Sequence, residues 1–138
     1  MSTHLKDKEE KILQLLECLA EESVKGTPII VEGKKDIETL RKLGIEGTII
    51  AAKTGGKTFL DAVSEIEKTH VKEVVLLLDF DRRGKELTKN LKQHLEKTKI
   101  KVNLTFWLNL SNILSKEVKD IEGLASYMET LKSKITNS

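Results

Sequence analysis

The sequence is poor in cysteine, proline and aromatic residues. Its 138 residues include one cysteine, one proline, three phenylalanines, one tyrosine and one tryptophan. The single cysteine, Cys18, excludes an internal disulfide and any zinc ribbon or finger built from several cysteines. Because Cys18 lies within an amphipathic helical pattern, we expect it to be a buried core thiol.

Long apolar runs and a strong net charge are also missing. No stretch reaches the roughly 18 to 20 apolar residues that a membrane-spanning helix needs, and no N-terminal region resembles a signal peptide. We therefore expect a cytoplasmic protein without membrane contact. The formal net charge is only +2, so any affinity for nucleic acid must come from local Lys and Arg side chains rather than from an overall field.

Apolar residues nevertheless make up 38% of the chain, which suits one domain with a modest core, and we expect residues 1–138 to form a single domain. Helical spacing over about residues 5–24 predicts an amphipathic helix. Four short apolar runs, at 29–31, 48–51, 74–78 and 100–107, are predicted strands. Helical patterns lie between them at 34–43, 57–68 and 84–95, and further helices are predicted over about 111–135, with a break near Gly123.

Strands that alternate with helices long enough for right-handed crossovers predict a parallel sheet covered on both faces. The predicted fold class is therefore α/β, with a four-stranded parallel Rossmann-like sheet. If the strand order reverses between the first and third strands, their carboxyl ends flank the crevice where open sheets of this kind bind ligands.

Carboxylates stand at the ends of these two strands. Glu32 follows the first strand, and Asp79 and Asp81 follow the third. Residues i and i+2 of an extended segment point to the same side, so Asp79 and Asp81 can share one cation. Carboxylates at a sheet edge suit Mg²⁺, with Mn²⁺ as an alternative, because Mg²⁺ prefers oxygen ligands and is completed by water and substrate phosphate. The sequence predicts a metal site formed by Glu32, Asp79 and Asp81.

Helix capping is the alternative role for these acids. Acidic residues near a helix N-terminus are favoured by its exposed amides and dipole, and for Asp79 or Asp81 taken alone capping is the better interpretation. The combination with Glu32 in this strand context favours the metal site. Asp120 and Glu122 could approach it from the C-terminal tail, although capping is the favoured role there.

Basic and glycine residues occupy the same loops. Lysines and arginines that would meet a phosphodiester near the metal are Lys34, Lys53, Lys57, Arg82 and Arg83. The two arginines are the better candidates, since Lys34 could equally lie in a solvated first helical turn. The glycines expected to form backbone turns around the crevice are Gly33, Gly55, Gly56 and Gly84.

Two motifs resemble those of the Toprim domain, which is shared by topoisomerases, bacterial-type primases, overcoming-lysogenization-defect nucleases, recombination-repair proteins and 5S rRNA maturases. Residues 31–36, VEGKKD, match its strand-Glu-Gly motif, and residues 78–84, LDFDRRG, match its Asp-x-Asp motif with the trailing Gly. The resemblance covers about residues 27–107. It implies that Glu32 is a general acid or base and that Asp79 and Asp81 bind magnesium.

The small size is most similar to the stand-alone Toprim proteins and the Toprim part of the rRNA maturases. The resemblance therefore implies a magnesium-dependent nuclease acting on nucleic acid, with RNA favoured over DNA. The alternative is a non-catalytic metal-binding module that docks RNA or a protein partner, because a minimal Toprim unit lacks the accessory domains that position substrate in larger relatives. A small-nucleotide phosphohydrolase is the least supported possibility.

Overall fold

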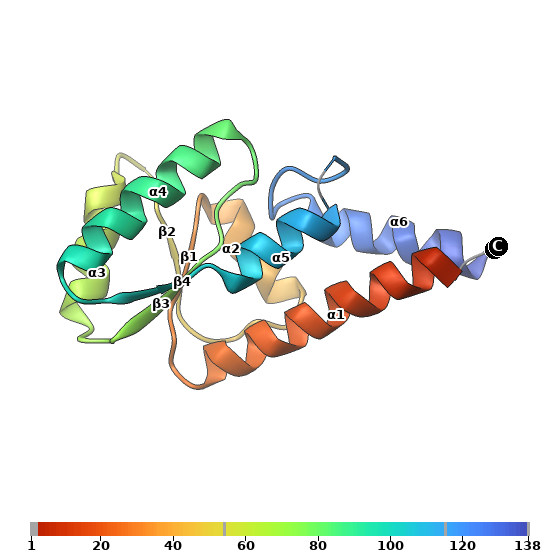
Figure 1. Ribbon diagram of the computed structural model, residues 1–138, viewed down its shortest axis with the longest axis horizontal. Helices are drawn as coiled ribbons and strands as arrows, with labels where there is room; N and C mark the ends of the chain where they lie inside the picture. The colour runs from red at the N-terminus through yellow and green to blue at the C-terminus, as the bar shows by residue number, and fades with distance from the viewer. Residues whose placement is uncertain (1–2, 54, 115, 138) are drawn as a thin grey trace.

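A parallel four-stranded sheet forms the centre of the protein (Figure 1). The structure is a computed structural model that describes residues 3–53, 55–114 and 116–137. Its strands are β1 (Ile29–Val31), β2 (Ile49–Ala51), β3 (Glu73–Leu76) and β4 (Lys101–Asn103), in the spatial order β2-β1-β3-β4. The predicted α/β class with an all-parallel sheet is confirmed. The strand order reverses between β1 and β3, so their carboxyl ends lie side by side.

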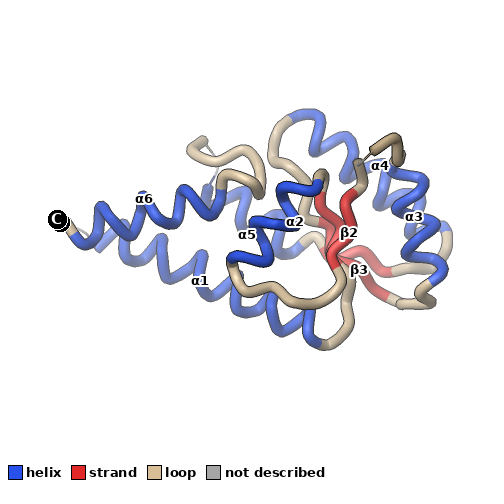
Figure 2. Tube along the Cα trace, turned by 180° about the vertical axis from the view of Figure 1, so that it is seen from behind, coloured by secondary structure: helices blue, strands red, loops and turns tan. Residues whose placement is uncertain are grey.

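Helices cover both faces of the sheet (Figures 1 and 2). The helices are α1 (Thr3–Val24), α2 (Lys34–Lys42), α3 (Phe59–Lys68), α4 (Arg82–Lys97), α5 (Thr105–Leu114) and α6 (Leu124–Thr136). Ile30 and Leu76 belong to the core under α3 and α4, whereas Val31 and Val75 belong to the core formed with the other four helices. Burial on both faces explains why β1, β2 and the part of β3 after Glu73 are continuous apolar runs, whereas β4, at one edge of the sheet, is exposed or half-buried.

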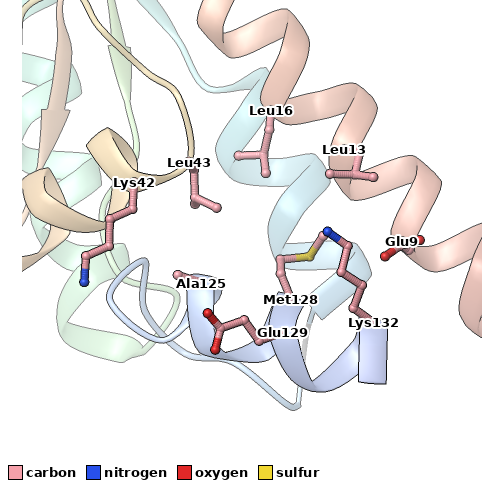
Figure 3. A pocket seen from close by; sticks show the side chains of 9 residues that line it. All are labelled: Glu9, Leu13, Leu16, Lys42, Leu43, Ala125, Met128, Glu129 and Lys132. Atoms are coloured by element: carbon pink, nitrogen blue, oxygen red, sulfur yellow. The ribbon is translucent and has the colours of Figure 1, made fainter. Parts of the chain in front are cut away.

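Helices α1 and α6 run side by side away from the sheet (Figures 1 and 2). Between them and the end of α2 lies a hollow of about 250 Å³ (Figure 3). Its apolar side chains are Leu13, Leu16, Leu43, Ala125 and Met128, and its charged ones are Glu9, Lys42, Glu129 and Lys132. This hollow lies at the C-terminal end of α2, whereas the N-terminal end of α2 follows directly on β1.

The fourth strand is shorter than the sequence predicted. β4 ends at Asn103, whose side-chain Oδ1 accepts a hydrogen bond of 2.9 Å from the backbone amide of Thr105, the first residue of α5. Phe106 and Leu110 are buried one helical turn apart. The prediction of a strand to residue 107 was wrong because apolar residues at the start of a buried helix also fit a strand alternation over a few positions.

Cys18 is exposed, so the prediction of a buried thiol was wrong. The buried stripe of α1 runs through Ile12, Leu16, Leu19 and Ser23, and Cys18 lies outside it. Ser23 is buried because its hydroxyl accepts a hydrogen bond of 2.8 Å from the amide of Gly47. In the ranges the structure describes, none of the helices combines the length and apolarity needed to cross a membrane.

Candidate metal centre

The ends of β1 and β3 bring Glu32 and Asp79 into one pocket. The backbone ladder continues past β3, because the amide of Leu77 donates a hydrogen bond of 2.9 Å to the carbonyl of Ile30. The pairing of Ile30 with Leu76 therefore places residue 32 level with residue 78, one position before Asp79. Both acids line a pocket of about 340 Å³ at the carboxyl ends of the strands.

Glu32 and Asp79 each keep a buried oxygen without a hydrogen-bond partner. These atoms are Glu32 Oε1 and Asp79 Oδ1. Burial, followed by the charge of Glu32, raises the pKa of Asp79 to about 8. Asp79 therefore keeps its proton, because ionising it beside a second carboxylate in a partly buried site is unfavourable. A divalent cation would replace this proton and satisfy both oxygens, so the two residues fit a hard metal ion.

Two more carboxylates line the same pocket, Asp36 from the first turn of α2 and Asp120 from the loop between α5 and α6. Asp36 is only 6% exposed, and its Oδ2 accepts a hydrogen bond of 2.9 Å from the amide of Gly33. Burial raises the pKa of Asp36, and the backbone amides of Gly33 and Glu122 act against that rise. Asp36 was not among the site residues predicted from the sequence, although its place three residues after the N-cap Gly33 was the available signal.

Several carboxylates line the pocket, but the described side chains do not form a group of three metal ligands. Among residues 3–53, 55–114 and 116–137, no three His, Cys, Asp or Glu side chains stand in a geometry that could hold a metal ion. This does not conflict with a magnesium site, because Mg²⁺ commonly takes one or two carboxylates directly and keeps several waters. The orphaned oxygens of Glu32 and Asp79 are the atoms best placed for direct contact.

Asp81 lies outside the lining of this pocket and caps α4. Its Oδ1 accepts a hydrogen bond of 2.8 Å from the amide of Gly84. Because α4 begins at Arg82, residue 81 belongs to a helix start rather than to a continued strand, and the i, i+2 argument does not apply. Capping, the alternative considered from the sequence, describes Asp81 in this structure.

The backbone around Asp79 is held from three directions. The indole nitrogen of Trp107 donates a hydrogen bond of 2.9 Å to the carbonyl of Leu78. The amide of Phe80 donates one of 2.7 Å to the carbonyl of Lys119. Gly84 allows the first turn of α4 to touch Asp79, because a Cβ at position 84 would lie 2.0 Å from the Asp79 carbonyl oxygen. Gly84 therefore permits a close approach rather than a turn.

The basic residues predicted from the sequence fall into three places. Lys34 and Lys53 are exposed and line the pocket, and the backbone amide of Lys53 donates a hydrogen bond of 2.9 Å to the carbonyl of Glu32. Arg82 and Arg83 are exposed on the first turn of α4, where Arg82 lies 3.7 Å from Glu86.

Lys57 lies away from the pocket. It forms an ion pair with Glu65 and lines a separate hollow together with Gly55 and Gly56. These two glycines have φ angles of +45° and +86°, which make a left-handed turn that other residues rarely adopt. The structure therefore puts Lys34 and Lys53, rather than Lys57, beside the carboxylates.

The stability of the metal-free protein is expected to fall as the pH rises from about 4 to about 8. Unfolded Asp79 loses its proton near a pKa of about 3.9, whereas the native residue keeps it to about 8. Across that window the native state holds more protons, so the free energy of unfolding decreases with pH, and it levels off above pH 8. The raised pKa of Asp36 acts in the same direction.

Urea denaturation in EDTA at several pH values, on the parent protein and on Asp79→Asn, measures this effect. The stability difference between the two proteins should widen in favour of the Asn variant as the pH rises to 8. A difference that does not change between pH 5 and 8 contradicts the raised pKa of Asp79.

The chain is similar to one known protein family, to proteins of several archaea and to one solved structure. The Toprim domain family matches residues 27–107. A UPF0292 protein of Methanocaldococcus jannaschii is 44% identical over 120 residues, which cover 86% of this chain and 91% of that protein. A UPF0292 protein of Pyrococcus furiosus is 37% identical and covers 89% of this chain and 88% of its own length. A solved protein structure from Aquifex aeolicus has a TM-score of 0.64 at 29% identity, covering 79% of this chain and 94% of that chain.

Proposed function

This chain belongs to the Toprim domain family, and from that premise we propose that it is a magnesium-dependent nuclease that cleaves phosphodiester bonds, in RNA rather than DNA. Toprim domains typically bind divalent metal ions such as Mg²⁺ and suggest a function related to nucleic acid. The observation that carries the proposal is the pair of buried, unpartnered oxygens on Glu32 and Asp79, in a pocket that lysines also line.

In this proposal, the residues of the pocket have different roles in phosphodiester cleavage. A bound magnesium ion would polarise a phosphate oxygen and neutralise its developing charge. Asp79 and Glu32 supply the carboxylate oxygens that hold the ion, and Glu32 transfers a proton as general acid or base. Lys34 and Lys53, at the rim, attract the phosphate backbone and help to position it. RNA is favoured because the small size of the chain resembles the Toprim part of the 5S rRNA maturases.

A non-catalytic module that docks RNA or a protein partner is the second candidate. One observation favours it: Asp81 caps α4, so two of the three motif acids, Glu32 and Asp79, line the pocket. Such a site could bind a cation and a phosphate without assembling the full set of groups that cleavage requires.

Cleavage of labelled structured RNA, and of DNA of the same sequence, in magnesium or in EDTA tests the proposal. The parent protein should cleave RNA with magnesium and should not cleave it in EDTA. Glu32→Gln should slow cleavage about 100-fold or more, the effect expected for loss of a general acid or base, while RNA binding changes little. The variant is prepared in parallel, and equal cleavage by both proteins contradicts the role proposed for Glu32.

The same assay separates the two candidates. Salt-sensitive RNA binding without turnover in magnesium or manganese supports the docking module and contradicts the nuclease. Preferential cleavage of the DNA contradicts the choice of RNA.

A further inference from the structure

The loop between α5 and α6, whose described residues are 116–123, forms one wall of the pocket. Asp120 and Glu122 of this loop line it, although both lie outside the residues matched by the Toprim family. We propose that Asp120 is a positioning residue for the divalent cation, and that the segment after residue 107 is therefore part of the metal centre. This inference rests on the proposed metal-dependent function and adds a residue that neither motif contains.

Two hydrogen bonds to backbone carbonyls hold the loop against Phe80 and against α2. The carbonyl of Lys119 accepts from the amide of Phe80 at 2.7 Å, next to Asp79. The carbonyl of Glu122 accepts from the hydroxyl of Thr39 on α2 at 3.4 Å. These contacts place residues 119–122 between the segment that follows β3, which carries Asp79, and α2, which begins two residues after Glu32.

Side chains anchor the same loop. Val118 and Ile121 are buried in the core, so the segment is packed rather than lying free on the surface. At its start, Glu117 forms an ion pair of 2.6 Å with Lys8 of α1. At its end, Glu122 lies 3.8 Å from Lys35. Asp120 is thus held at the pocket by contacts on both sides of it in the sequence.

The hydrogen bond that Asp120 accepts in this loop does not account for a negative charge at position 120. Asp120 Oδ1 accepts a hydrogen bond of 2.8 Å from the amide of Gly123, just before α6. Asparagine provides the same acceptor and caps helices as well as aspartate does. Asp120 instead adds a carboxylate to the pocket that Glu32, Asp36 and Asp79 also line, and like charges gathered in one pocket repel one another. Together with the orphaned oxygens of Glu32 and Asp79, this repulsion is relieved by a cation in the pocket.

Asp120 acts on the cation without being a catalytic residue. One of its carboxylate oxygens is engaged by Gly123, and no three described acids have a geometry that could hold a metal ion. Magnesium keeps several waters when it binds proteins, and acids near a hydrated ion strengthen binding through their charge and through those waters. Substitution of Asp120 should therefore change metal affinity more than it changes the rate of the cleavage step at saturating metal.

Calorimetric titration of the full chain with MgCl₂, repeated with MnCl₂, tests this role. Asp120→Asn keeps the oxygen that accepts from the amide of Gly123 and removes the charge, and it should weaken metal affinity about 10-fold, the lower end of the effect of residues around a metal site. Asp61→Asn is the matched control, because the Asp61 carboxylate also accepts a hydrogen bond from a backbone amide, that of Thr58, but lies outside the pocket. Its affinity should stay within about twofold of the parent.

Thermal melting with and without magnesium gives a second readout. In EDTA, Asp120→Asn should melt at or above the temperature of the parent, and its rise on adding magnesium should be smaller. If the Asn variant is less stable in EDTA, Asp120→Ser, which also caps a helix, provides the same comparison. Parent-like metal affinity in the folded variant overturns the role of Asp120 while leaving the proposed function intact, whereas a parent protein that binds neither ion overturns the proposed function itself.

Discussion

Asp79→Asn is expected to abolish magnesium-dependent cleavage and at the same time to stabilise the metal-free protein. The first effect follows because Asp79 provides a buried oxygen for the ion. If the metal ion no longer stabilises the transition state by several kcal/mol, the cleavage rate should fall at least about 1000-fold. The second follows because Asn has nearly the same shape without the charge that Glu32 repels. Opposite changes in activity and stability distinguish a functional acid from a structural one.

Cleavage assays and melting curves at pH 7 to 8 in EDTA measure the two effects. Asp61→Asn is the matched control, since Asp61 caps α3, lies outside the pocket and keeps an acceptor as Asn. It should leave cleavage unchanged. Asp79→Asn protein that cleaves like the parent, or that melts below the parent in EDTA, contradicts the role assigned to Asp79.

Gly84→Ala is expected to destabilise the protein by about 3 kcal/mol, the upper end of the usual cost of overpacking. A methyl group at this position would lie 2.0 Å from the Asp79 carbonyl oxygen and 2.6 Å from its carbon. Both are backbone atoms, which a rotamer change cannot move, so α4 must shift away from the end of β3. The expected sign is opposite to that of helix propensity, which favours Ala over Gly.

Urea denaturation of Gly84→Ala and of Gly33→Ala tests this packing. Gly33 has an extended backbone, with φ −138° and ψ 175°, and a Cβ there would meet its nearest neighbour, Asp36 Oδ2, at 3.9 Å. Alanine at position 33 should therefore change the free energy of unfolding by less than about 1 kcal/mol. Equal stabilities of the two variants would show that the close approach at Gly84 relaxes without cost.

Much of the fold follows from short-range patterns in the sequence. The buried strands are continuous apolar runs, and each is followed by a helical period, which is enough to predict a parallel sheet with covered faces. The location of Glu32 and Asp79 follows from the same pattern, because a parallel sheet carries all strand ends on one edge. The boundary between β4 and α5 does not, since the alternation through Phe106 continues across the point where Asn103 begins the turn into the helix.

The remaining features of the site depend on contacts that a local pattern does not contain. Whether Asp81 faces a cation or caps α4 depends on where that helix starts, and Arg82 is already helical. The approach of Asp120 depends on the docking of a loop through the Lys119 carbonyl. The role of Gly84 could not be predicted from the sequence either. A glycine in a sequence suggests a turn, and only the packing of α4 against Asp79 shows that Gly84 permits a close approach.

During synthesis, the α5–α6 loop is added to the chain after both motifs, so the pocket gains this wall last. Thr39 and Glu122, which are hydrogen-bonded, are 83 residues apart in the sequence, so this contact closes one of the longest loops in the chain. A nascent chain that ends at Trp107 contains both motifs, residues 31–36 and 78–84. It lacks Lys119, whose carbonyl accepts a hydrogen bond from the amide of Phe80. At about 5 to 20 residues per second, the ribosome adds the residues of this loop within a few seconds, and until then the chain lacks one wall of the pocket.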